Sequence, residues 1–178
     1  MSEREALVLA VPRRELYAIR GFSSEITVPV LESLQQETWF AHASSIENDV
    51  DVKCVQFGLL VRRDEQWLVG ESGILLHTAP IQENVARFGE GLGAIRRLAH
   101  RAGSELMATA QTGIELIGLF NEDRLPETRA YLILIYVLTV PARTAAPEGM
   151  VWVTARHLAD LGLDPVSTLL VDYCRYGR

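Results

Sequence analysis

The stretch QENVARFGEGLGAIRRLAHRAG, residues 82–103, contains the clearest helical pattern in the chain. Its apolar side chains recur with the spacing of a single helical face: Leu92, Ile95, Ala99 and Ala102. A stripe of this kind is typical of a helix that packs one side against a core, so the pattern predicts a helix over 82–102. Gly103 is well placed to end that helix.

Strand patterns surround this helix on both sides. Apolar or alternating runs predict strands at 6–11, 52–62, 67–69, 113–120, 129–140 and 150–153. The run 129–140 is apolar without alternation, as in a central strand that is covered on both faces. Further helices are predicted at 13–19, 25–36, 154–161 and from Asp164-Pro165 onward, with a polar loop at 41–51. Because strands and helices are mixed and do not alternate regularly, the order predicts an α/β sandwich with a mixed sheet.

Length and composition indicate an ordinary globular chain. The 178 residues suffice for one domain with a real core, and 48% of them are hydrophobic and 22% charged. The net charge of −6 does not favour binding to nucleic acid, because proteins that bind nucleic acid usually carry an excess of basic residues. The longest apolar run, 130–138, is far shorter than a membrane helix requires. We therefore expect a cytoplasmic protein that has neither a membrane nor nucleic acid as a partner.

Motifs with a well-defined chemistry are missing from the sequence. The two cysteines, Cys54 and Cys174, are isolated, and the four histidines lack the spacing of a zinc site. The chain also lacks a P-loop, a dinucleotide-binding glycine motif and the GxSxG motif of a serine nucleophile. The sequence therefore predicts neither zinc nor covalent catalysis.

Residues 96–103, RRLAHRAG, resemble the end of the Nudix box, G-x5-E-x7-R-E-U-x-E-E-x-G-U, in which U is aliphatic. Arg96, Leu98 and Gly103 occupy the arginine, aliphatic and glycine places. Other segments resemble a bacterial Nudix-like subgroup: the opening 8–13, the pair at 21–22, GLFNED at 118–123 and MVWV at 150–153. The resemblance implies a single Nudix-like domain over 1–178, an α/β/α sandwich with a mixed sheet, on which 1–50 packs as an N-terminal extension or subdomain.

The chain departs from the Nudix box at the positions whose side chains bind metal in the family. Phe88 stands where the first glutamate belongs and Gln82 where the leading glycine belongs, and the three clustered glutamates are replaced by Arg97, His100 and Arg101. In the family these carboxylates hold Mg²⁺ or Mn²⁺ against a diphosphate. Arginine is permanently cationic and has no acceptor atom, so it cannot ligate a metal. We therefore expect no metal cofactor at the box and no ordinary Nudix hydrolysis.

The subgroup also carries a G-I-G-G-H segment before the box. This chain has Gly73-Ile74-Leu75-Leu76-His77, which keeps the ends and replaces the middle glycines by leucines. Leu75 and Leu76 add bulk where the resemblance implies close approach of backbone to a ligand. His77 is expected to line that former ligand cleft.

Three hypotheses follow for the function. In the first, the chain binds a nucleotide or another phosphorylated ligand, or a protein partner, without hydrolysis. Its anion site would use Arg96, Arg97, His100, Arg101 and His77, with Glu115 or Glu122 as polar rim. The competing interpretation of those basic residues is a solvated last turn that complements the helix dipole.

The second hypothesis is an active phosphohydrolase of nucleoside diphosphate derivatives, dependent on Mg²⁺ or Mn²⁺. Its relocated metal ligands would come from Glu83, Glu90, Glu122 and Asp123. The third is an interaction protein whose cleft is filled by Leu75 and Leu76. The resemblance further suggests a homodimer, because many Nudix proteins are dimeric.

Overall fold

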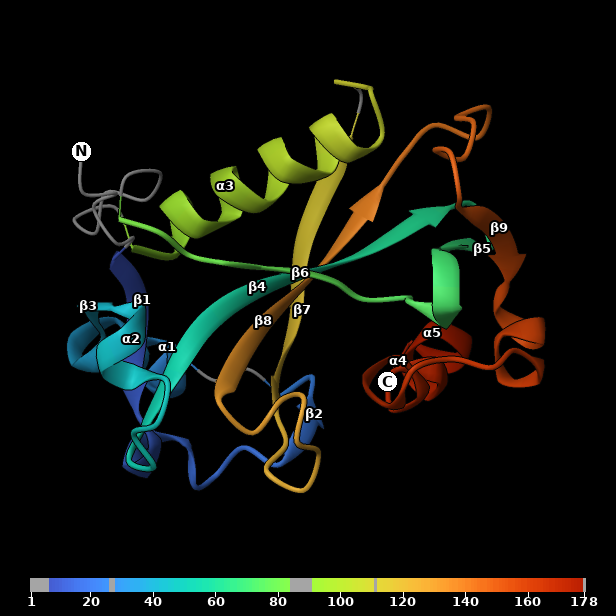
Figure 1. The fold of residues 1–178 in the computed structure, drawn as a ribbon. Coiled ribbons are helices and arrows are strands. Elements are labelled where there is room, and N and C mark those ends of the chain that lie inside the picture. The colour runs from blue at the N-terminus through green and yellow to red at the C-terminus, as the bar shows by residue number, and fades with distance from the viewer. Residues whose placement is uncertain (1–6, 26–27, 84–90, 111, 178) are drawn as a thin grey trace.

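The computed structural model describes residues 7–25, 28–83, 91–110 and 112–177. Their strands form one sheet with the order β2-β7-β8-β4-β1-β3, to which β5, β6 and β9 attach through β4 (Figure 1). The strands are β1 (Leu7–Pro12), β2 (Gly21–Ser23), β3 (Trp39–His42), β4 (Val52–Arg63), β5 (Gln66–Val69), β6 (His77–Pro80), β7 (Gly113–Asn121), β8 (Tyr131–Thr139) and β9 (Val151–Thr154). Strands β4 and β8 pair in parallel, and the other pairs are antiparallel. The mixed sheet that the sequence predicted is thus confirmed.

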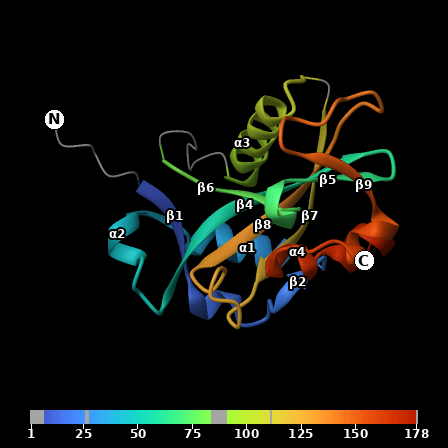
Figure 2. The same cartoon turned by 45° about the vertical axis from the view of Figure 1, so that its right-hand side comes forward.

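Helices cover both faces of this sheet, with α3 on one side and α4 and α5 on the other (Figures 1 and 2). The α-helices are α1 (Val28–Glu37), α2 (Ala43–Ile46), α3 (Gly91–Leu106), α4 (Pro165–Thr168) and α5 (Val171–Tyr176). Short 3-10 turns are η1 (Arg13–Leu16), η2 (Glu71–Gly73) and η4 (Ala155–Asp160). The arrangement is the predicted α/β/α sandwich.

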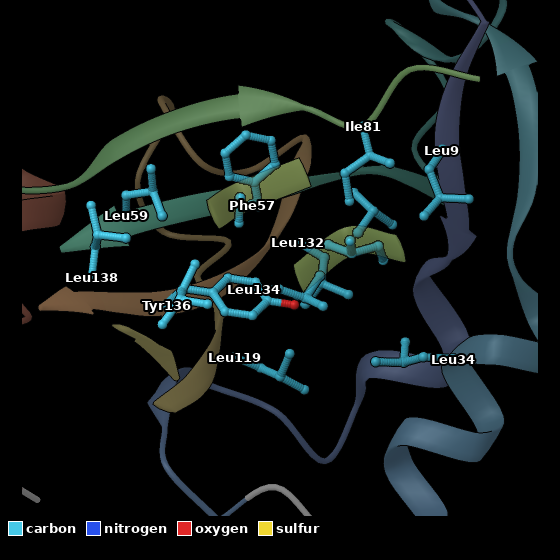
Figure 3. Close-up of a cluster of buried hydrophobic side chains, with 14 of the residues drawn as sticks. Leu9, Leu34, Phe57, Leu59, Ile81, Leu119, Leu132, Leu134, Tyr136 and Leu138 are labelled. Atoms are coloured by element: carbon cyan, nitrogen blue, oxygen red, sulfur yellow. The ribbon is translucent and has the colours of Figure 1, made fainter. Parts of the chain in front are cut away.

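Two hydrophobic clusters lie on the two faces, because side chains alternate along a strand. Phe57, Leu134 and Tyr136 belong to the cluster beneath α3 (Figure 3). Leu60 and Ile135, from the same two strands, belong to the cluster beneath η4 and α5. Strand β8 contributes buried residues to both clusters, as its unbroken apolar run predicted.

Helix α3 is the element on which the sequence interpretation depends. Its predicted stripe faces the core, with Ile95 and Ala99 buried in the cluster that includes β4 and β8. The predicted start before residue 91 lies largely outside the described residues. The predicted end at Gly103 is wrong, because the helix continues to Leu106. Gly103 instead lets α3 approach the sheet: a Cβ atom there would lie 2.6 Å from Cδ2 of Leu138.

The N-terminal part of the chain is integrated into the sheet. Strand β1 pairs with β4 on one side and with β3 on the other. The predicted loop at 41–51 is therefore wrong at its start, because β3 extends to His42 and α2 follows at once. Strand β3 was not predicted because it is only four residues long and lies at the edge of the sheet, where none of its residues is buried.

The C-terminal part follows its local sequence signals. Asp164 caps α4 by accepting hydrogen bonds from the backbone amides of Val166 and Ser167, at 3.0 and 3.2 Å, and Pro165 opens the helix, as predicted. The Ser167 hydroxyl in turn accepts from the backbone amide of Leu75 at 2.9 Å. Among the described helices, none has the length and apolar character needed to cross a membrane.

Candidate anion site on helix α3

Between α3 and the start of β7 lies an open pocket of about 530 Å³, here called the α3–β7 groove. Its lining residues come from one face of the helix and from the first residues of the strand: Gly93, Arg96, Arg97, His100, Thr112, Gly113 and Ile114. Strand β2 pairs with β7 only at Leu119–Asn121, so it does not cover the first residues of β7, which line the groove together with α3. The groove therefore brings together three of the basic residues that the sequence singled out.

Two of these side chains are held in place by contacts with β7 and the residue before it. Nη2 of Arg96 donates to the backbone carbonyl of Ile114 at 3.1 Å. Nε2 of His100 lies 2.8 Å from Oγ1 of Thr112 and 3.3 Å from its backbone oxygen, with the donor set by the tautomer. The Arg96 contact leaves further donors of its side chain available, since a guanidinium carries five N–H groups.

Arg97 and Arg101 lie on the same helix but differ in their surroundings. Arg97 lines the groove, and a Cβ atom added to Gly93 would lie 3.7 Å from its Nη1. Arg101 is outside the groove lining, and its Nε donates to the Glu105 carboxylate at 2.9 Å. The structure thus separates Arg101 from the other three basic residues.

His77 lines a different pocket. That pocket, of about 610 Å³, lies against β4, β8 and the start of α4 and also includes Gln56, Thr78 and Tyr131. Nε2 of His77 is buried and has no hydrogen-bond partner among the described residues. Burial lowers the pKa of His77 below its ordinary value, because desolvation penalises the charged ring. His77 therefore does not join the basic residues of α3.

Glu122 and Asp123 lie in a third place, the loop between β7 and β8. Glu122 is buried and accepts two hydrogen bonds from the Arg124 guanidinium, at 2.9 and 2.7 Å. This pairing holds the pKa of Glu122 at about 2, well below its usual range. Asp123 contacts Arg13 and lies 2.7 Å from Nζ of Lys53. Both carboxylates already have cationic partners, which a metal ion would have to displace.

Lys53 is a residue whose importance the sequence analysis missed. Its side chain is fully buried at the start of β4, and Nζ also donates to Oδ1 of Asn121 at 2.5 Å. Burial lowers the pKa of Lys53, and the hydrogen bond and charge of Asp123 partly offset that effect. The available signal was a lysine on the inward-facing register of a strand, two residues before buried Val55.

The remaining candidates are dispersed. Glu83 follows β6, Glu115 is exposed on β7 and is not among the groove lining residues, and Glu90 lies outside the described residues. Leu75 and Leu76 are buried in the cluster beneath η4 and α5. Among the described residues no three His, Cys, Asp or Glu side chains gather closely enough to hold a metal ion.

The groove is suited to binding an anion. Its described lining offers two guanidinium groups, an imidazole and a hydroxyl, and no carboxylate. Guanidinium groups match the geometry of phosphate and carboxylate oxygens and need no metal to do so. The same set lacks the anionic oxygen ligands that Mg²⁺ requires.

Comparison with known proteins identifies the fold. The structure matches the crystal structure of Tm1382, described as "a putative Nudix hydrolase", with a TM-score of 0.78 over 93% of this chain and 96% of that chain. The two sequences are 15% identical, so the match establishes the Nudix fold and carries no activity with it. No protein-family model and no curated protein matches the sequence. The Nudix-like fold inferred from the altered box is thereby confirmed.

Proposed function

We propose that this Nudix-fold chain, with its degenerate box, binds a small phosphorylated ligand in the α3–β7 groove without a metal ion and without hydrolysing it. The observation that carries the proposal is the groove lining, where Arg96, Arg97 and His100 stand together and no described carboxylate accompanies them. A metal-dependent site needs the opposite charge at this place.

The positions of the donors support the assignment. The bond from Arg96 to the Ile114 carbonyl holds one guanidinium at the junction of helix and strand. The pair formed by His100 and Thr112 orients the imidazole in the same groove. Donors held by protein contacts lose less side-chain entropy when a ligand arrives, and this favours binding. A phosphate group would replace solvent at these donors with charge-assisted hydrogen bonds.

The same residues argue against hydrolysis at this groove. Attack on a phosphoanhydride needs an activated water and neutralisation of the leaving charge, which Nudix enzymes obtain from metal ions. The groove supplies positive charge, but among its described lining residues His100 is the only side chain of a type that commonly serves as a general base. With both carboxylates of 122–123 paired to arginine or lysine, we favour binding over a relocated hydrolytic centre.

Titration with inorganic pyrophosphate in the presence of a chelator tests the proposal. We expect pyrophosphate to raise the thermal unfolding temperature and to bind measurably by calorimetry. Arg97→Gln should weaken binding by about tenfold, the effect of losing one charge-assisted contact. Arg101→Gln is the matched control, since it makes the same charge change on the same helix outside the groove, and it should leave affinity within about twofold.

Several outcomes would overturn this assignment. Mg²⁺-dependent release of phosphate from a nucleoside diphosphate derivative that survives Arg97→Gln and is lost in Glu122→Ala would establish the relocated hydrolase instead. Absence of any ligand effect would favour a protein-interaction role. The homodimer suggested by the family resemblance is part of the proposal and is tested by sedimentation equilibrium.

A further inference from the structure

A further pocket lies between the β4–β5 hairpin, the start of η4 and α5. It has a volume of about 650 Å³ and is here called the β5–α5 pocket. Its lining is Arg62, Asp64, Glu65, Trp67, Thr154, Ala155, Arg156, Cys174, Arg175 and Tyr176. A pocket of this size is in the range of small-molecule sites. It shares no residue with the α3–β7 groove.

Three arginines from three separate elements converge on this pocket. Arg62 is the last residue but one of β4, Arg156 belongs to η4, and Arg175 belongs to α5. Within the described part of the chain, none of the three guanidinium groups makes a hydrogen bond or an ion pair, in contrast to Arg13, which is fully engaged. Cations brought close together repel one another, so an anion bound between them would be stabilised.

Aromatic rings hold two of these arginines and leave one ring face accessible. The Arg62 guanidinium carbon lies 5.8 Å from the ring centroid of Trp67, which is buried. The Arg175 guanidinium carbon lies 5.8 Å from the ring of Tyr176, which is 61% exposed. An exposed ring beside a cation is a surface on which a planar heterocycle can stack.

The pocket also contains acceptors and lacks a usable nucleophile. Asp64 and Glu65, at the hairpin turn, make no ion pair within the described residues and can accept hydrogen bonds from hydroxyl or amino groups. Cys174 lines the pocket, but burial raises the pKa of its thiol to about 12, so the thiolate is not populated near neutral pH. The chemistry of the site is therefore non-covalent binding.

From these features we infer that the β5–α5 pocket is a nucleotide-binding site. The arginines 62, 156 and 175 would bind the phosphate groups, Tyr176 would stack on the base, and Asp64 or Glu65 would accept from the sugar hydroxyls. A phosphate alone would leave Tyr176 and the carboxylates unused, and a carboxylate ligand would not engage three forked cations as fully. This inference does not depend on the proposed function of the α3–β7 groove.

The test is a titration of the full chain with ADP, followed by amide chemical shifts and by calorimetry. We expect the shifts to be concentrated at residues 154–156 and 174–176. The double variant Arg156→Gln/Arg175→Gln should lose affinity by about tenfold or more, given the strength of charge-assisted bonds. Arg143→Gln, at an exposed arginine without a described ion pair outside the pocket, is the control and should bind as the unaltered chain does.

Further titrations test the contribution of the base separately from that of the phosphate groups. Tyr176→Leu should weaken ADP but not pyrophosphate, and adenosine should bind more weakly than ADP. Repeating the titration in Arg97→Gln lowers any contribution from the α3–β7 groove about tenfold, while the shifts at residues 154–156 and 174–176 report the β5–α5 pocket by itself, so failure of one site is distinguishable from failure of the other. The inference is overturned if ADP leaves residues 154–156 and 174–176 unperturbed, or if the double variant keeps full affinity. Shifts at residues 154–156 and 174–176 that saturate at the same concentration of pyrophosphate as of ADP would overturn the nucleotide assignment.

Discussion

At the scale of single residues, the buried polar groups determine how the free energy of unfolding depends on pH and how much it falls when a charged side chain is replaced. Lys53, Asn121, Glu122 and Thr128 are all buried, and they belong to β4, to the end of β7 and to the β7–β8 connection. Burying polar groups is costly unless each has a partner. This small region therefore depends on its partners more strongly than the exposed basic face of α3 does.

His77 should make stability depend on pH. Because burial lowers its pKa, the unfolded chain binds the proton more readily than the folded chain. Its contribution is fully present above the unfolded pKa and is lost as the pH falls from that value toward the folded pKa. Urea unfolding from pH 8 to about pH 5 should show a fall in the free energy of unfolding below about pH 6.5 that is reduced in His77→Gln. Identical slopes for the two proteins would contradict this.

The Lys53–Asp123 pair should respond asymmetrically to removal of either partner. Asp123→Ala leaves the buried Lys53 ammonium without its carboxylate partner and should lower the free energy of unfolding by about 2 kcal/mol. This value is smaller than for a fully buried ion pair, because the Asp123 carboxylate is half-exposed. Lys53→Met removes the buried charge and leaves Asp123 paired with Arg13, so its cost should be clearly smaller. Chemical unfolding of both variants measures the difference, and a larger loss in Lys53→Met would show that the ammonium is net stabilising.

At the scale of elements, packing decides what sequence propensity leaves open. A helix former such as alanine is favoured over glycine throughout an isolated helix. In α3, the sheet lies very close to Gly103, whereas there is space for a side chain at Gly93. The two positions differ in what the new methyl group would contact.

Gly93→Ala and Gly103→Ala should therefore have opposite effects. At Gly93 the nearest atom to a new Cβ is 3.7 Å away, so Gly93→Ala should stabilise the chain by about 0.5–1 kcal/mol. At Gly103 the new Cβ would lie 2.6 Å from a Leu138 methyl, so Gly103→Ala should destabilise it by about 1–3 kcal/mol. Urea unfolding of both variants checks the signs. Stabilisation by Gly103→Ala would mean that α3 can move away from β8 at little cost.

At the scale of the whole molecule, the sheet joins segments that are far apart in sequence. Strand β1 lies between β3 and β4, and its residues Leu9, Ala10 and Val11 are buried. The parallel pair β4–β8 at the centre brings together residues more than 70 positions apart, such as Cys54 and Tyr131. Stability is consequently distributed over the length of the described chain.

Removal of residues 1–50 should abolish independent folding. The deletion exposes the edge of β4 at residues 52–54 and uncovers the apolar cluster that β1 closes. We expect the fragment 51–178 to aggregate when expressed alone, as monitored by size-exclusion chromatography. Co-expression with the fragment 1–50 is the matched control and should recover soluble material. A soluble 51–178 fragment that unfolds cooperatively would contradict the prediction.

What the sequence by itself determined is the local structure and the chemical character of individual positions on α3. The stripe of α3, the apolar run of β8 and the cap at Asp164 are periodic or short-range signals, and all three were predicted correctly. The arginines at positions 97 and 101 cannot ligate a metal ion, because a guanidinium group has no acceptor atom.

Only the tertiary structure decided which side chains meet. Arg96, Arg97 and His100 share a groove with Thr112, whereas Arg101 pairs with Glu105 and His77 lies in another pocket. Lys53 and Asp123 meet across 70 residues of sequence. The physical reason is that periodicity specifies which face of an element is buried, while contacts between elements depend on strand order, register and the closeness of packing. Gly103 shows the same limit, because its role as a contact with Leu138 exists only once α3 lies on the sheet.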